Sequence, residues 1–330
     1  MTPTRRALLG GALALAASPR SAAAATAAAA ATPLRPAAAA TPLPARLCGA
    51  FVPWTGDGGR DPGLRAWEGW LARPPATVPA LDYWGKDDWS AFRATAWLPA
   101  FWARTAPARP IVWSIPLTVP GTPLAAVAAG HHDAEFAAAA RAIATSQPAA
   151  VIRLGWEMNV RTMAWYAGTE PVAFIAAFRR VAALFRTASS RFSLDWCPSW
   201  GPQDGPADLF YPGDDAVDVV GLDVYDYRKG SATVEARWAE QVLAVPFGLD
   251  WLVRFAGARG KPMSIPEWGV GQGGDDPFFV KAMRGWLGAH EKALRYACYF
   301  DVDGLWPTRL DPERLPLSTA AFRSGFSAVA

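Results

Sequence analysis

The chain is poor in the residues that metal sites and disulfide frameworks require. It contains 3 cysteines and 3 histidines in 330 residues. Cys48, Cys197 and Cys298 each lie in or beside an apolar run, without a second cysteine or a histidine at metal-ligand spacing. We therefore expect no metal site and at most one disulfide, and buried free thiols are the simplest interpretation. The histidines are expected to be surface or helix-capping residues.

A strong excess of charge of one sign is also missing. The 32 basic and 29 acidic residues leave a formal net charge of +3, and no basic cluster of the kind that nucleic-acid binding needs is present. Hydrophobic residues make up 52% of the chain, which is enough for a sizeable core. The composition argues against a nucleic-acid partner and against a disordered chain, and it favours a globular protein.

The N-terminus has the pattern of an export signal. Arg5 and Arg6 precede a weakly apolar stretch, 7–17, that is shorter than the ~20 residues needed to span a bilayer, and several Ala-x-Ala sites follow. We expect a twin-arginine export signal over 1–31, an Ala/Pro-rich linker over 32–45 and one folded domain over 46–330. The alternative is a disordered Ala-rich tail that happens to carry two arginines. Export would place the protein in the periplasm or outside the cell.

Short apolar runs alternate with helix-like segments after Arg46, which is typical of a (β/α)8 TIM barrel forming a single catalytic domain. The candidate strands are 47–52, 77–83, 110–115, 151–156, 192–196, 217–224, 262–266 and 294–300, and candidate helices include 133–146, 170–187, 246–258, 277–290 and 318–326. A doubly wound sheet is the competing fold, but no Gly-x-Gly-x-x-Gly follows the first strand. In a barrel, functional residues gather where strands end.

Two strand ends present a glutamate beside tryptophan. Glu157 follows the fourth candidate strand, and Glu267 follows the seventh. A carboxylate at an apolar barrel mouth is costly to desolvate unless it is paired or used. Two such groups are what a glycosidase needs, one to protonate the leaving oxygen and one to attack the anomeric carbon. The alternative is that each is a solvent-facing loop residue bonded to a neighbouring strand.

The surroundings of the two glutamates suggest different roles. Glu157 lies between Trp156 and Met158, and apolar neighbours favour the protonated acid. Glu267 can accept a hydrogen bond from Tyr225 on the neighbouring strand, which favours the ionised nucleophile.

The chain is rich in tryptophan, with 17 Trp against 7 Tyr. Those in helical segments are expected to pack between helices and barrel, whereas part of those at strand ends can stack on the apolar faces of sugar rings. The preferred sugar platforms are Trp165, Trp200 and Trp306, and Trp113 and Trp196 are expected to belong to the core.

Three motifs resemble a known family. Arg153-Leu-Gly-Trp-Glu157-Met-Asn159, Asp223-Val-Tyr225 and Pro266-Glu267-Trp268-Gly269, together with Trp306, resemble the retaining clan A glycoside hydrolases, and specifically glycoside hydrolase family 26. The resemblance implies that Glu157 is the general acid/base and Glu267 the nucleophile. It implies that Tyr225 bonds the nucleophile with Asp223 behind it, that Arg153 orients the carboxylates, and that Trp306 floors the subsite where the sugar is attacked.

The motif around Glu157 departs from the family. Members normally have histidine before the acid/base, where this chain has Trp156, so the protein looks like a divergent member and mannan is not singled out among its substrates. Clan A enzymes keep an asparagine immediately before the acid/base, whereas Asn159 follows Glu157 by two positions. The predicted substrate-binding set is Arg153, Trp156, Asn159, Trp165, Trp200, Asp223, Tyr225, Trp268 and Trp306.

These observations predict an exported, monomeric retaining glycoside hydrolase of the endo type. Its substrate is expected to be a β-linked polysaccharide of the β-glucan, mannan or xylan class, cleaved by a two-glutamate mechanism without cofactor or metal. Two alternatives stay open on the same fold: a glycan-binding protein that does not hydrolyse, and a transglycosylase, in exopolysaccharide processing.

Overall fold

The computed structural model describes residues 42–53, 60–226, 233–271, 273–303 and 307–329. Within these residues one parallel sheet has the strand order β6-β5-β4-β3-β2-β1-β9-β8-β7, and an additional pairing of β6 with β8 closes it into a ring. The strands are β1 (Gly49–Phe51), β2 (Ala80–Tyr83), β3 (Ile111–Ile115), β4 (Val151–Leu154), β5 (Ser193–Trp196), β6 (Val219–Gly221), β7 (Val224–Tyr225), β8 (Met263–Gly269) and β9 (Leu294–Phe300).

The short strands β6 and β7 together make one strand of the barrel. β6 pairs with β5 and with the start of β8, and β7 pairs with the end of β8 at Trp268 and Gly269. Between them Asp223 forms a bridge with Ser199, beyond the end of β5. The sequence predicted one continuous strand here, and the structure divides it because Asp223 turns toward Ser199. The sheet is a closed eight-stranded parallel barrel, so the predicted (β/α)8 fold is confirmed.

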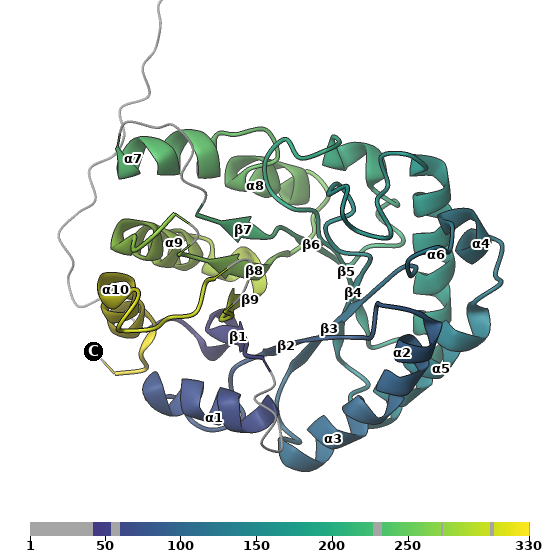
Figure 1. Ribbon diagram of the computed structural model, residues 1–330, viewed down its shortest axis with the longest axis horizontal. Coiled ribbons are helices and arrows are strands. Elements are labelled where there is room, and N and C mark those ends of the chain that lie inside the picture. The colour runs from purple at the N-terminus through teal and green to yellow at the C-terminus, as the bar shows by residue number, and fades with distance from the viewer. Residues whose placement is uncertain (1–41, 54–59, 227–232, 272, 304–306, 330) are drawn as a thin grey trace, which may run out of the picture. The chain divides into compact units, whose positions relative to one another are not determined.

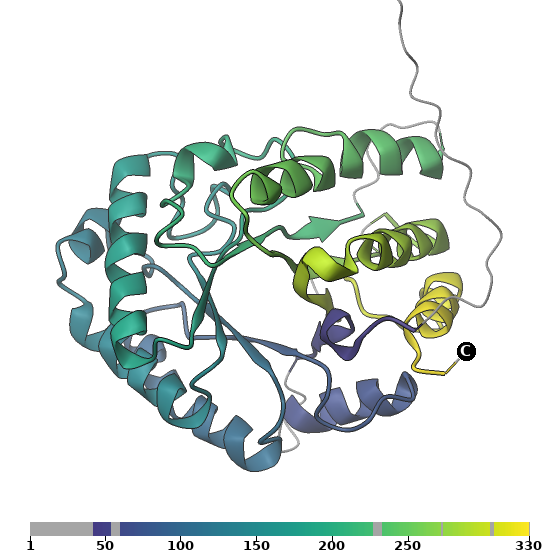
Figure 2. The same ribbon diagram turned by 180° about the vertical axis from the view of Figure 1, so that it is seen from behind.

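Helices surround the ring on its outside, as Figures 1 and 2 show from its two sides. They are α1 (Arg60–Trp70), α2 (Trp89–Ala94), α3 (Leu98–Thr105), α4 (Leu124–Ala128), α5 (Asp133–Ser146), α6 (Pro171–Ala188), α7 (Val234–Arg237), α8 (Leu249–Gly257), α9 (Pro277–Ala289) and α10 (Pro316–Phe326), with 3₁₀ turns at Ala45–Leu47, Thr95–Trp97, Ala207–Phe210 and Glu291–Ala293 and a π-helical segment η4 (Trp238–Leu243). The helices predicted at 133–146 and 277–290 agree with α5 and α9 to within one residue.

Helix α6 illustrates why these segments are helical and where they pack. Pro171 is its first residue, a position where the missing N–H costs nothing. Apolar side chains then recur every three or four residues on one face, and all of them are buried: Phe174, Ala177, Phe178, Val181, Ala182 and Phe185. This face covers the outside of the barrel.

The barrel has a core of its own inside the ring. Leu81, Val112, Val151, Tyr296 and Cys298 pack together there, apart from the larger core between strands and helices. All three cysteines are free and buried, as predicted. Within the described part of the chain, none of the helices combines the length and the apolar character that crossing a bilayer requires.

Candidate active site

Alternation along β8 decides which side chains face the site. Glu267 is 6% exposed and bonds to groups from other strands inside the barrel, whereas its neighbour Trp268 is 1% exposed and packs on Tyr299 and Phe322. Successive residues of a strand point to opposite faces. Trp268 is therefore part of the packing between the barrel and α10, a placement that does not support the expectation that it binds substrate.

Three donors from three different strands hold the Glu267 carboxylate. The Tyr83 hydroxyl donates to Oε1 at 2.5 Å, and Arg153 Nη1 donates to the same oxygen at 2.7 Å. The Tyr225 hydroxyl donates to Oε2 at 2.6 Å. Charge-assisted hydrogen bonds of this kind are short and directional, so both oxygens have a fixed orientation.

Arg153 is fully buried and joins two carboxylates. Its Nη2 donates to Asp223, its Nη1 serves both Glu267 and the Ser114 hydroxyl, the latter at 3.0 Å, and the side chain has no exposed surface. Burial alone would lower the pKa of Arg153, but the charges of Asp223 and its other neighbours raise it well above its usual value. Asp223 is equally buried, so its contact is with Arg153 and not with the cleft.

Glu157 lies in a tight turn just after β4. Gly155 has φ 48° and Glu157 φ 51°, both in the left-handed region. A Cβ on Gly155 would come within 2.9 Å of the Leu117 side chain, so the turn needs glycine there. The Glu157 amide donates to the Cys197 carbonyl at 2.7 Å, which ties the turn to the end of β5.

The pKa of Glu157 is raised to about 7, by burial first and by the negative charge of Glu267 second, while Arg153 and a hydrogen bond with Ser199 act in the opposite direction. The two glutamates are therefore close enough to interact electrostatically. The raised pKa leaves one carboxyl group partly protonated near neutral pH, and the other carboxyl group is held by three donors. Such a pair can combine proton donation with nucleophilic attack.

Asn159 is buried and has a structural role. Its amide nitrogen donates to the Ser199 carbonyl at 2.8 Å, and its amide oxygen accepts from the Ser199 backbone N–H at 2.9 Å. This pair of bonds joins the loops after β4 and β5 and occupies both ends of the amide. The expectation that Asn159 binds substrate is not supported by this placement.

The predicted tryptophan platforms differ in their placement. Trp156 is 4% exposed and lies between Tyr83, at a ring separation of 5.3 Å, and the Arg153 guanidinium, 5.5 Å from its ring. Trp165 is buried beside Trp156 and donates its indole N–H to the Trp156 carbonyl at 2.5 Å, so it supports Trp156 and offers no face to a sugar. Trp306, like Trp54, lies outside the described residues.

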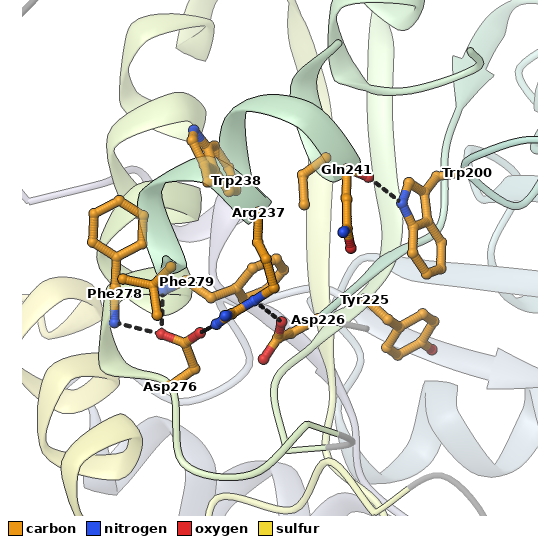
Figure 3. Close-up of a pocket in the computed structure, with 11 residues that line it drawn as sticks. Trp200, Tyr225, Asp226, Arg237, Trp238, Gln241, Asp276, Phe278 and Phe279 are labelled. Atoms are coloured by element: carbon orange, nitrogen blue, oxygen red, sulfur yellow. Dashed lines mark hydrogen bonds and ion pairs between the residues drawn. The ribbon is translucent and has the colours of Figure 1, made fainter. Parts of the chain in front are cut away.

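Trp200 lies on the edge of a small pocket beside Tyr225 (Figure 3). Its ring is 6.4 Å from that of Tyr225, and its indole N–H donates to the Gln241 carbonyl at 3.0 Å. On the other side of the pocket, Arg237 donates to Asp276 at 2.7 Å and lies 4.0 Å from Asp226. Through Arg237, these contacts link the segment after β7 to the start of α9 and so help to fix the position of the strand that carries Tyr225.

The sequence analysis missed Tyr83 and the aromatic residues beside it. Tyr83 is the last residue of β2, as Tyr225 is the last residue of β7. Phe51 and Phe300, which end β1 and β9, stack on each other at 5.1 Å, and Phe51 meets Tyr83 edge-on at 4.9 Å. A tyrosine at a strand end was the signal that could have identified Tyr83.

Replacing Tyr225 by phenylalanine should lower kcat/KM by about 10- to 100-fold, because Glu267 loses a hydrogen bond to a charged group worth roughly 1.5–3 kcal/mol. Tyr83→Phe should have a similar effect. Steady-state kinetics would measure both. Tyr211→Phe is the matched control, since that hydroxyl donates to Asp214 at 2.8 Å and should leave the rate unchanged. Equal rates in all three variants would contradict a role for these donors.

Comparison with known proteins gives a family match and several similar folds. The model for glycosyl hydrolase family 26 matches residues 144–280. The chain is similar to a Cellulomonas fimi endo-beta-1,4-mannanase double mutant, at 20% identity and TM-score 0.61 over 85% of this chain and 71% of that one. It is also similar to Bacillus subtilis mannanase man26, at 14% identity and TM-score 0.56 over 86% and 85%.

The catalytic domain of the GH26 endo-beta-1,4-mannanase of Bacillus sp. JAMB-750 is another similar structure, at 18% identity and TM-score 0.58 over 86% of both chains. None of the curated proteins compared with the chain matches it. The predicted resemblance to family 26, as a divergent member, is confirmed. The protein is a glycoside hydrolase.

Proposed function

Starting from a glycoside hydrolase that resembles family 26, we propose that the protein cleaves a β-linked polysaccharide with retention of anomeric configuration. The observation that supports this most strongly is the contrast between Glu157 and Glu267. One glutamate has its pKa raised to about 7, and the other accepts three hydrogen bonds from Tyr83, Arg153 and Tyr225.

In the proposed mechanism Glu267 attacks the anomeric carbon while Glu157 gives its proton to the departing glycosidic oxygen. A covalent glycosyl-enzyme forms and the leaving chain departs as an alcohol. Glu157, now ionised, takes a proton from water, and the water oxygen displaces Glu267 from the anomeric carbon. Each step inverts the anomeric centre, so the product retains the configuration of the substrate.

The other residues position the nucleophile in this mechanism. Tyr83 and Tyr225 hold one carboxylate oxygen each, and Arg153 holds the oxygen that Tyr83 also contacts. Asp223 keeps the guanidinium in place from the opposite side. An orientation fixed before the substrate binds lowers the cost of reaching the transition state.

We propose an endo mode of action on a β-glucan, mannan or xylan. The similar structures named above are described as endo-beta-1,4-mannanases or mannanases, which supports a β-linked backbone as substrate. Trp156 stands where the family normally has histidine, so mannan is one candidate among the three. The same proposal includes export by the twin-arginine route, with a signal over 1–31, a linker over 32–45 and the folded domain over 46–330. It also includes a monomeric state and catalysis without a cofactor.

A screen of pure β-glucans, mannans and xylans with detection of new reducing ends would test the substrate class. Endo action should produce a rapid fall in viscosity and a ladder of oligosaccharides. Added acceptor oligosaccharide would reveal transglycosylation as longer products. A protein that binds one of these polymers but releases no reducing ends from any of them would contradict the hydrolase proposal and favour the glycan-binding alternative.

The rate should fall as the pH rises through about 7, because Glu157 must carry a proton to act as the acid and its pKa is raised to about 7. Replacing Glu267 by glutamine removes one cause of this shift, so Glu157 should lose its proton at a lower pH in that variant. The pH profile of kcat/KM would measure the fall in rate. A carbon-13 NMR titration of the glutamate carboxyl groups would measure the shift in the titration of Glu157. An unchanged titration of Glu157 would contradict the coupling.

A further inference from the structure

A cavity of about 420 Å³ opens at the end of the barrel opposite to the two glutamates. Residues at or just before the first positions of the strands line it, among them Pro79 before β2, Pro110 before β3 and Ala150 before β4. Tyr296, which packs inside the barrel, also contributes to its wall. A volume in the range of ~300–1,000 Å³ is typical of small-ligand sites.

The polar lining of this cavity is strongly basic. Arg46, Arg109, Arg191 and Arg295 line it together, and no carboxylate is among the described lining residues. Arg109 is neutralised, since both of its terminal nitrogens donate to Glu68 at 2.9 Å.

The other three arginines are at least partly exposed. Arg46 lies 3.7 Å from the Glu291 carboxylate, donates to the Glu291 carbonyl at 2.9 Å and to the Leu294 carbonyl at 3.4 Å, and keeps 41% of its side chain exposed. Arg191 and Arg295 are exposed, and the described part of the chain offers neither of them an ion pair. Arg191 and Arg295 therefore give the cavity an excess of positive charge that no ion pair within the described residues offsets.

An irregularity in the sheet places Arg295 at this position. In the pairing of β8 with β9, Met263 aligns with Leu294 and the next residue, Ser264, aligns with Tyr296. Arg295 is thus an extra residue on β9, and a bulge of this kind redirects a side chain and is a recurrent device beside functional sites.

The neutral part of the lining suits a sugar ring. Pro107, Pro110 and Pro148 present apolar C–H surfaces. The Gln147 amide oxygen accepts the Trp113 indole N–H at 2.7 Å, which fixes the orientation of the amide, and its nitrogen has no protein acceptor within the described residues. The cavity thus combines hydrogen-bond donors with apolar walls.

We propose that this cavity binds an anionic sugar unit, bearing a carboxylate or a phosphate group, through Arg191 and Arg295 with Arg46 at the rim. A guanidinium group matches both anions with two parallel N–H donors. The site is separate from the cleavage site, and its occupation would anchor the enzyme on polysaccharides with acidic substituents. It stands independently of the mechanism proposed above.

Calorimetric titration of the full chain with glucuronic acid, glucose 6-phosphate and glucose would test the proposal. One or both acidic sugars should bind and glucose should not, and added salt should weaken binding. The variant Arg191→Ala/Arg295→Ala should bind the acidic sugar at least about 10-fold more weakly, because two charge-assisted contacts are lost. Its hydrolysis of neutral polysaccharide should stay unchanged. Arg323→Ala, an exposed arginine on α10, is the control and should bind normally.

Two further variants separate the cavity from the cleavage site. Ala149→Trp places a bulky side chain at an exposed lining position and should block binding without removing charge, whereas Glu267→Gln should bind the acidic sugar normally. Equal binding of glucose, full binding by the double arginine variant, or loss of binding only in Glu267→Gln would overturn the proposal. Preference for one acidic sugar would identify the anion as carboxylate or phosphate.

Discussion

Replacement of Glu267 by alanine is expected to lower kcat/KM by a factor on the order of 10⁴ or more, the loss that removal of the proposed nucleophile predicts. The carboxylate proposed to attack the anomeric carbon is removed, and Tyr83, Arg153 and Tyr225 are left without their common acceptor. Release of reducing ends from the preferred polysaccharide would measure the loss. Glu313→Ala is the control, because Glu313 is exposed and lies far from Glu267 in the sequence. This variant should retain full activity.

Azide can separate the role of nucleophile from a role in binding. In Glu267→Ala the space of the side chain is free, so azide can attack an activated glycoside directly and form a glycosyl azide of inverted configuration, with the leaving group departing. Proton NMR of the product would identify the anomer. Full activity of Glu267→Ala, or an azide product with retained configuration, would contradict the nucleophile assignment.

Replacement of Arg153 by methionine is expected to destabilise the fold by about 3–5 kcal/mol, the typical cost of removing one partner of a buried ion pair. Glu267 and Asp223 would then lie in the barrel without a compensating charge, since Arg153 is the group that joins them and is itself fully buried. Urea unfolding followed by tryptophan fluorescence would measure the change in the free energy of unfolding.

Two companion variants test this explanation. Arg153→Lys keeps the positive charge but loses the two-pronged geometry, so it should lose less stability than Arg153→Met. Asp223→Asn in the Arg153→Met background removes one uncompensated charge and should recover part of the stability. A double variant less stable than Arg153→Met would show that charge compensation is not the reason.

The sequence was informative where one strand end could be interpreted by itself. Glu157, Glu267 and Tyr225 all follow apolar runs, so their position at the barrel mouth could be predicted from pattern alone. Alternation along a strand also predicts that Trp268 faces away from the site if Glu267 faces into it, an inference available from the sequence but not drawn.

Other features depend on contacts between distant segments. Asn159 is buried because its amide matches the backbone at Ser199, and Trp165 because its indole reaches the Trp156 carbonyl. Nothing in the residues around either position specifies those partners. Tyr83 ends its strand as Tyr225 does, so its place at the barrel mouth could have been predicted. Its bond to Glu267 could not, because β1 and β9 lie between β2 and β8 in the sheet.

The left-handed backbone at Glu157 has a consequence for how the enzyme can be improved. At φ 51° a residue with a Cβ is strained, by roughly 1–2 kcal/mol relative to a right-handed conformation, and glycine is not. Glu157→Gly should therefore raise the thermal unfolding temperature while removing the proposed acid, and differential scanning calorimetry would show whether it does. Selection for heat resistance alone would favour loss of this glutamate, so a stabilised form of the enzyme must be sought with activity under selection at the same time.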